Sequence, residues 1–231
     1  MTTNWYCHFR RLGVQVVALA VLCNGVLGAV TGNLMAAPPQ KPIKIVAFGD
    51  SLTAGYMLPE SDAFPAKLQK ALTAKGLRVD VVNAGVSGDT TAAGLDRIGW
   101  AVPSDIDGVI VELGANDALR GLDPASARAN LDKILATLKA QKAEILIAGM
   151  RAPRNMPAPY VTAFDSIYPD LAQKYGALLY PFFIETIAMN ASLNLADGIH
   201  PNARGVDAIV ADILPKVEEL IGRIETRRNG S

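Results

Sequence analysis

The chain contains little cysteine and little histidine, and both shortages limit the chemistry open to it. Its two cysteines are Cys7 and Cys23, and its two histidines are His8 and His200. If the N-terminal segment is removed, the rest of the chain has no thiol, which excludes disulfide bonds, cysteine catalysis and thiolate metal sites there. His200 then remains as the single imidazole that could act as a base.

An excess of charge of either sign is also lacking. Lys and Arg number 22, Asp and Glu number 22, and no basic run with interleaved aromatic residues occurs. A chain without a net field has no long-range attraction for nucleic acid or anionic lipid. We therefore expect a small-molecule partner, no nucleic acid, and membrane contact only through the N-terminal segment if that segment is retained.

Residues 1–37 have the parts of a secretory signal. Arg10 and Arg11 precede a charge-free stretch that is apolar from Leu12 to Val30, and small residues end it. This pattern predicts an exported protein, periplasmic or secreted. The segment could also remain as a membrane anchor, since about 20 apolar residues span a bilayer. Residues 38–42, three of them proline, are predicted to form a linker.

Beyond the linker, short β-branched runs alternate with longer stretches of helical spacing. The predicted strands are Ile43–Phe48, Val79–Asn83, Gly108–Leu113, Glu144–Ala148 and Ala177–Tyr180. The predicted helices are Ala63–Lys75, Thr91–Trp100, Pro124–Gln141, Tyr160–Tyr175 and Gly205–Arg223. This alternation predicts one α/β domain over residues 43–225, with a parallel sheet covered by helices on both faces and a tail of residues 226–231.

Polar residues follow three of these strands, at the edge where such sheets bind ligands. Ser51 follows the first strand and could be presented there or could cap the next helix. Asn116 follows the third, where its amide could bind an oxyanion or stabilise a turn. Asp197 and His200 follow the fifth, where Asp197 could orient the imidazole or could simply be a capping residue beside a loop histidine.

A glycine-rich segment, Gly85–Thr91, follows the second strand. Its backbone N–H groups could approach a ligand closely, although the segment could also be a plain turn. Phosphate binding is disfavoured because the dinucleotide spacing and the lysine of the phosphate loop are absent. Together, the four strand ends would supply a nucleophile, a base, an orienting carboxylate and oxyanion donors, which is the set needed for acyl transfer.

These motifs resemble the sequence blocks of the SGNH/GDSL hydrolases. The matching blocks are Gly49-Asp50-Ser51-Leu52, Gly88, Gly114-Ala115-Asn116-Asp117 and Asp197-Gly198-Ile199-His200. The longer matches Phe48–Tyr56, Gly85–Thr91 and Asp197–Asn202 are most similar to the periplasmic thioesterase I, lysophospholipase and arylesterase branch.

The resemblance covers about residues 43–222 and implies a flavodoxin-like three-layer α/β/α sandwich with a five-stranded parallel sheet. It implies hydrolysis of carboxylic esters or thioesters by Ser51, His200 and Asp197. The oxyanion hole would consist of the Ser51 and Gly88 N–H groups and the Asn116 side chain. The resemblance implies neither a metal nor an organic cofactor.

Specificity and activity class stay open at this point. Met150, Met156 and Tyr160 follow the fourth strand and could line an acyl pocket with Met57 and Leu58, or could belong to rigid surface loops. The same blocks also serve carbohydrate O-deacetylases. A non-catalytic lipid- or sugar-binding module is a further alternative, but such a module would not need the Ser, His and Asp set.

Overall fold

The computed structural model describes residues 41–230, so the predicted signal and residues 38–40 of the predicted linker lie outside the described residues. Within this range five parallel strands form one sheet in the order β2-β1-β3-β4-β5. The strands are β1 (Ile43–Gly49), β2 (Val79–Gly85), β3 (Gly108–Glu112), β4 (Glu144–Ala148) and β5 (Leu178–Tyr180). The predicted α/β class with a five-stranded parallel sheet is confirmed.

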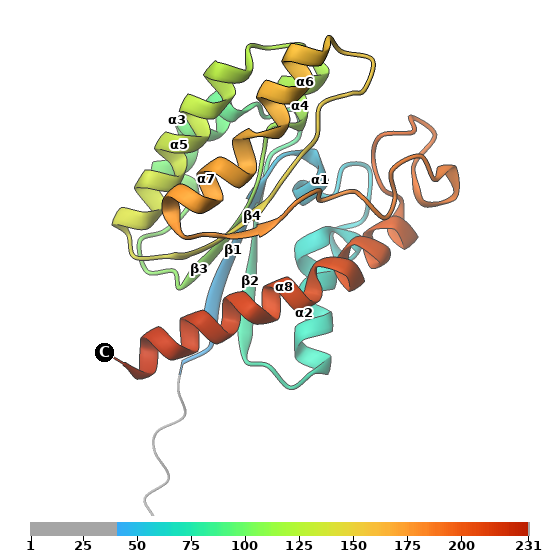
Figure 1. The fold of residues 1–231 in the computed structure, drawn as a ribbon. Coiled ribbons are helices and arrows are strands. Elements are labelled where there is room, and N and C mark those ends of the chain that lie inside the picture. Colours follow the sequence, from blue (N-terminus) through green and yellow to red (C-terminus); the bar gives the residue numbers. More distant parts are fainter. Residues whose placement is uncertain (1–40, 231) are drawn as a thin grey trace, which may run out of the picture. The chain divides into compact units, whose positions relative to one another are not determined.

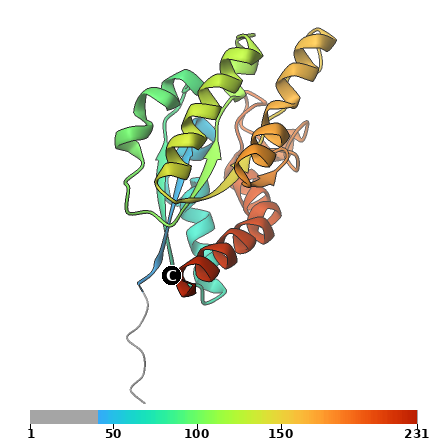
Figure 2. The ribbon, with the colours of Figure 1, turned by 60° about the vertical axis from the view of Figure 1, so that its left-hand side comes forward.

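Helices cover both faces of the sheet, which gives the predicted three layers (Figure 1). One face carries α2 (Phe64–Ala74) and α8 (Ala203–Asn229), and the other carries α3 (Thr91–Ala101), α5 (Pro124–Ala140), α6 (Ala158–Asp165) and α7 (Ile167–Tyr175). The rotated view shows the sheet between these two layers (Figure 2). The shorter elements are α1 (Ser51–Ala54), α4 (Ala115–Leu119) and the 3-10 turns η1 (Glu60–Asp62) and η2 (Ala191–Leu193).

The burial of each strand agrees with its place in the sheet. Every residue of β3 is buried, as expected for a strand with helices on both sides. The edge strand β2 is more open, and Val82 keeps 45% of its surface exposed. Burying one Val, Leu or Ile side chain contributes roughly 1.5–3 kcal/mol, so the central strands stabilise the sheet most strongly. They also place the ends of β1 and β3 side by side, with Gly49 paired to Glu112.

The helix ends agree with the local sequence signals. Asp123 caps α5 by accepting a hydrogen bond from the Ala125 N–H at 3.0 Å, and Pro124 occupies the first turn, where its missing N–H costs nothing. Gly76 and Gly176 follow α2 and α7 with φ angles of 76° and 61°. This left-handed conformation is the one that glycine adopts readily at the end of a helix.

The predicted single helix Tyr160–Tyr175 is wrong, because two helices occupy this stretch. α6 ends at Asp165, Ser166 lies between, and α7 begins at Ile167. Pro169 explains the break: it has no N–H to donate to the Asp165 carbonyl, and its ring would clash with that carbonyl in a continuous helix.

The C-terminal boundary also differs from the prediction. α8 extends to Asn229, so residues 226–229 belong to the helix and do not form a tail. Arg228 stabilises this end, with its guanidinium donating to Asp107 at 2.6 and 2.9 Å. Basic side chains in a last turn also interact favourably with the helix dipole. Neither α8 nor any other helix between residues 41 and 230 is long and apolar enough to cross a membrane.

Candidate active site

Ser51 is the first residue of α1, directly after β1. Asp50 caps this helix, with its Oδ1 accepting from the Leu52 N–H at 3.0 Å. The cap is therefore Asp50, which leaves the Ser51 hydroxyl available for another partner. That partner is His200, whose Nε2 lies 2.9 Å from Ser51 Oγ. Ser51 itself is only 9% exposed.

Asp197 orients the imidazole from within the same turn. Its Oδ2 lies 2.7 Å from His200 Nδ1, while its Oδ1 accepts the N–H groups of His200 and Ile199 at 3.0 and 2.9 Å. The two backbone donors, followed by the imidazole, lower the pKa of Asp197 to about 2. The carboxylate is therefore ionised at neutral pH. An ionised carboxylate at Nδ1 favours the tautomer that leaves Nε2 free to accept a proton from the serine.

Gly88 and Asn116 follow β2 and β3 at the same edge of the sheet, and Asn116 lines the cavity beside Ser51, whereas Gly88 is exposed and is not among its lining residues. Gly88 has a φ angle of 89°, a conformation that favours glycine. The Asn116 side chain projects from the short helix α4, and its Nδ2 donates to the Asp89 carbonyl at 2.9 Å and to Asp50 Oδ2 at 3.2 Å. The structure thus brings all five predicted catalytic and oxyanion-hole residues to the carboxyl edge of the sheet.

Asp117 fixes the turn that carries Asn116. Its carboxylate accepts from the backbone N–H of Thr91 at 2.8 Å and from the Thr91 hydroxyl at 2.6 Å. Gly114, at the start of α4, has a φ angle of 115°, and any side chain there would overlap the hydroxyl of Tyr168. These contacts are the structural reason for Gly114 and Asp117 in the Gly-Ala-Asn-Asp motif, while Ala115 and Asn116 line the cavity beside Ser51.

A cavity of about 650 Å³ opens beside Ser51 and His200. This volume is typical of small-molecule sites. Of the five residues predicted to line an acyl pocket, only Met150 does so. Met57 is 77% exposed, Tyr160 donates its hydroxyl to a backbone carbonyl, and neither they nor Leu58 and Met156 are among the lining residues.

Much of the cavity wall is formed instead by residues that the sequence patterns do not indicate. Apolar side chains after β5 line it: Phe182, Ile184, Ile187 and Met189. Tyr56 is a second omission, since its ring centroid lies 4.5 Å from that of His200. One signal was available, because residues 182–189 form a mostly apolar run directly after a strand end. That run has neither strand nor helix period, so hydrophobic periodicity does not assign it to any element.

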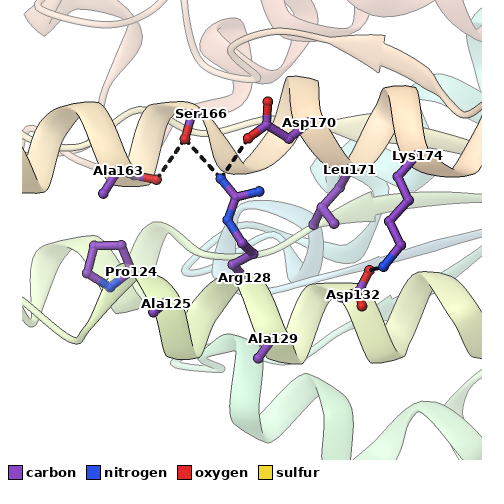
Figure 3. Close-up of a pocket in the computed structure, with 10 residues that line it drawn as sticks. All are labelled: Pro124, Ala125, Arg128, Ala129, Asp132, Ala163, Ser166, Asp170, Leu171 and Lys174. Carbon is purple, nitrogen blue, oxygen red and sulfur yellow. Dashed lines mark hydrogen bonds and ion pairs between the residues drawn. The ribbon is translucent and has the colours of Figure 1, made fainter.

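A second hollow, of about 540 Å³, lies between α5 and α7 (Figure 3). Its charged side chains are paired with each other: Arg128 with Asp170 at 2.8 Å and Lys174 with Asp132 at 2.6 Å. None of the predicted site residues lines it. Of these two hollows among residues 41–230, the cavity beside Ser51 is the one that contains the candidate reactive groups.

Comparison with known proteins shows that the stretch of chain containing these residues matches one protein family. The GDSL-like lipase/acylhydrolase family matches residues 47–208. An arylesterase of Vibrio mimicus is 38% identical over 168 residues, which cover 72% of this chain and 84% of the relative. Thioesterase 1/protease 1/lysophospholipase L1 of Escherichia coli K12 is 40% identical over 173 residues, covering 74% and 81%.

Solved structures show the same architecture. The crystal structure of AlinE4, an SGNH-hydrolase family esterase, is 50% identical with a TM-score of 0.66, and the match covers 78% of this chain and 97% of that one. The crystal structure of TesA is 34% identical with a TM-score of 0.73 and covers 77% and 99%. The likeness extends over nearly the whole of each solved structure.

Proposed function

This chain belongs to the GDSL-like lipase/acylhydrolase family, and we propose that it hydrolyses carboxylic esters or thioesters with Ser51 as nucleophile. One observation supports the proposal above all: Ser51, His200 and Asp197 form a continuous hydrogen-bonded relay of 2.9 and 2.7 Å at an apolar cavity. Relatives named as arylesterase, thioesterase and lysophospholipase support the same reaction class.

In the proposed reaction Ser51 Oγ attacks the acyl carbonyl while His200 Nε2 takes its proton. The carbon–oxygen or carbon–sulfur bond to the leaving group then breaks, and His200 returns the proton to that group. Water attacks the resulting acyl-enzyme with His200 again as base, which releases the acid and restores the serine. Asp197 stays ionised throughout and stabilises the imidazolium that forms in each half of the reaction.

The oxyanion would bind the N–H groups of Ser51 and Gly88 and the side-chain amide of Asn116. Both Asn116 amide hydrogens have partners in the structure, at 2.9 Å on Asp89 and at 3.2 Å on Asp50. We propose that the oxyanion replaces the longer of these two bonds. The shorter bond keeps the amide plane in place, so little reorganisation accompanies the reaction.

Asn116→Ala is expected to lower kcat by about 10²–10³-fold, because loss of one oxyanion donor typically costs this much. Steady-state turnover of a p-nitrophenyl ester measures the effect. Gln69→Ala is a matched control, since Gln69 also donates from a partly buried amide, to the Val79 carbonyl at 2.8 Å, but does not line the cavity. A loss below about fivefold in the Asn116 variant would remove this residue from the oxyanion hole.

The profile of kcat/KM is expected to rise from acid to neutral pH. His200 accepts a proton only when its imidazole is neutral, so the competent fraction grows as the ring loses its proton. Asp197 does not cause this rise, since its pKa of about 2 keeps it ionised over the whole range. Ester turnover in buffers of constant ionic strength measures the profile, and a decrease from acid to neutral pH would exclude a neutral imidazole base.

A panel from p-nitrophenyl acetate to p-nitrophenyl decanoate tests the proposed activity. The apolar wall after β5 favours an optimum at medium-length acyl groups, because burying each CH₂ contributes about 0.8 kcal/mol. Turnover of acetate alone would indicate a carbohydrate O-deacetylase. Absence of turnover with every ester, and with acyl thioesters, would indicate a binding module and refute the proposal.

We also propose that the protein is exported. The support is the sequence pattern of residues 10–30, a basic pair followed by an apolar stretch. Fractionation of producing cells, with the mass of the recovered chain, tests the proposal. An intact chain confined to the cytoplasm would refute it.

A further inference from the structure

Glu112 is a buried carboxyl group that the proposed reaction does not use. It is the last residue of β3 and has no exposed surface. Its Oε2 accepts from the Thr53 hydroxyl at 2.7 Å and from the Asp50 N–H at 3.3 Å. These two partners flank Ser51 in the sequence. The carboxyl group therefore lies against the turn that presents the nucleophile.

The backbone is shaped to admit this contact. Gly49 precedes the turn, and a Cβ atom on it would overlap the Thr53 hydroxyl and lie 2.5 Å from Glu112 Oε2. Only glycine at this position lets the end of β1 approach the Glu112 and Thr53 pair. Gly49 in the Gly-Asp-Ser-Leu block is thus explained by Glu112 rather than by the reacting groups.

Glu112 is best described as a neutral acid. Burial raises its pKa well above the ordinary value, and the charge of neighbouring Asp50 raises it further. Burial also raises the pKa of Asp50, to about 6, so at neutral pH the proton resides on Glu112. Oε2 accepts both of the hydrogen bonds described above, and among the described residues Oε1 has no hydrogen-bond partner.

We propose that Glu112 is a positioning residue, which fixes Ser51 through Thr53 and Asp50. The path is direct: Asp50 donates its N–H to Glu112 and accepts the Leu52 N–H on Oδ1, so its bonds reach both neighbours of Ser51 in the sequence. One carboxyl group thereby fixes the turn that presents the nucleophile. The inference rests on the role proposed above for Ser51.

Two substitutions at Glu112 separate positioning from charge. Glu112→Gln keeps an acceptor for Thr53 and Asp50 and stays neutral, so kcat is expected within about threefold of the parent. Glu112→Ala removes the contact, and kcat is expected to fall about 10–100-fold with KM nearly unchanged, since displacements near 1 Å cost this much. The rate constant for fluorophosphonate labelling of Ser51 should fall together with kcat. The fraction of protein labelled at completion measures how much of it is folded, so kcat can be expressed per labelled site.

Tyr168→Phe is the matched control, because it tests whether general loosening at the end of β3 is enough to lower kcat. Tyr168 is fully buried and donates its hydroxyl to the Leu113 carbonyl at 3.0 Å, next to Glu112. Its removal costs stability without touching Ser51, so kcat per labelled site should stay within about twofold. An equal loss of kcat in this variant would mean that general loosening explains the Glu112 effect, and would overturn the proposal.

Two further outcomes would overturn it. Full kcat per labelled site in Glu112→Ala would leave Glu112 with a purely structural role. A Gln variant as slow as the Ala variant would mean that an ionised carboxylate is needed.

Thr53→Val is the alternative test if Glu112→Ala yields no folded protein. Because this variant loses one hydrogen bond to Glu112, kcat is expected to fall about 3–10-fold. An unchanged kcat would count against the proposal. Labelling that persists in a Ser51→Ala variant would instead refute the proposed function.

Discussion

Replacement of Ser51 by alanine is expected to lower kcat by about 10⁴–10⁶-fold, the range seen when one member of such a triad is removed. The hydroxyl has one hydrogen-bond partner in the structure, Nε2 of His200, so its loss should change the reaction far more than the fold. Turnover of p-nitrophenyl esters measures the loss, and thermal unfolding of the same preparation shows whether the fold is retained. Labelling by a fluorophosphonate should disappear, because the phosphonylated atom is absent.

Ser87→Ala provides the matched control. Ser87 is an exposed serine that directly precedes Gly88, so it lies beside the proposed oxyanion hole without bonding to His200. Its variant should keep kcat and labelling within about twofold of the parent, as expected for a surface substitution. Unchanged labelling in the Ser51 variant, or its loss in the Ser87 variant, would assign the nucleophile elsewhere.

The candidate site could be predicted from the sequence because of the sheet, not because of any single motif. Ser51 follows one strand and Asn116 another, and a parallel topology places successive strand ends at one edge. Short β-branched runs such as Val109–Val111 identify buried strands, since only a strand covered on both faces is apolar throughout. The sequence patterns do not give the order of the strands, which the structure shows to be β2-β1-β3-β4-β5.

The cavity wall could not be located in this way. From the sequence, Met57 and Tyr160 could line the pocket or belong to surface loops, because local backbone geometry decides where each side chain points. Met57 has a φ angle of 57° and is directed to solvent, and Tyr160 bonds to the Leu122 carbonyl. The wall residues after β5, such as Phe182 and Met189, belong to an irregular loop without a hydrophobic period. Periodicity identifies regular elements and says little about such loops.

Buried polar groups are the second feature that sequence patterns do not show. Arg97 lies in α3, where a single arginine among apolar residues ordinarily faces solvent, and yet its side chain is only 7% exposed. Glu112 ends an apolar strand and is fully buried. Arg97 and Glu112 both contact the ends of the strands that lead into the candidate active site. Their partners come from other elements, and only the folded chain brings these together.

Arg97→Met is expected to lower the free energy of unfolding by about 3–5 kcal/mol, the usual effect of removing one partner of a buried ion pair. The guanidinium bonds to Asp89 at 2.6 Å and to the Ala84 and Gly49 carbonyls at 2.8 and 2.9 Å. It also lies 4.2 Å from the centre of the Phe48 ring. Methionine preserves the packing on Phe48 but removes the guanidinium bonds to the Asp89 carboxylate and to both carbonyls, of which Gly49 keeps the Val86 N–H as a donor. Urea or guanidinium unfolding followed by circular dichroism measures the change.

Two companion variants identify the cause of that loss. The double variant Arg97→Met/Asp89→Leu removes the unpaired charge as well, so it should recover part of the stability, because much of the cost arises from the carboxylate that is left buried. Arg128→Met breaks the exposed pair with Asp170 on α7 and should cost at most about 1 kcal/mol. A loss below about 1 kcal/mol in Arg97→Met would mean that water replaces the guanidinium without difficulty. The turn between Gly85 and Thr91 would then be held by its own backbone and by Asn116, not by α3.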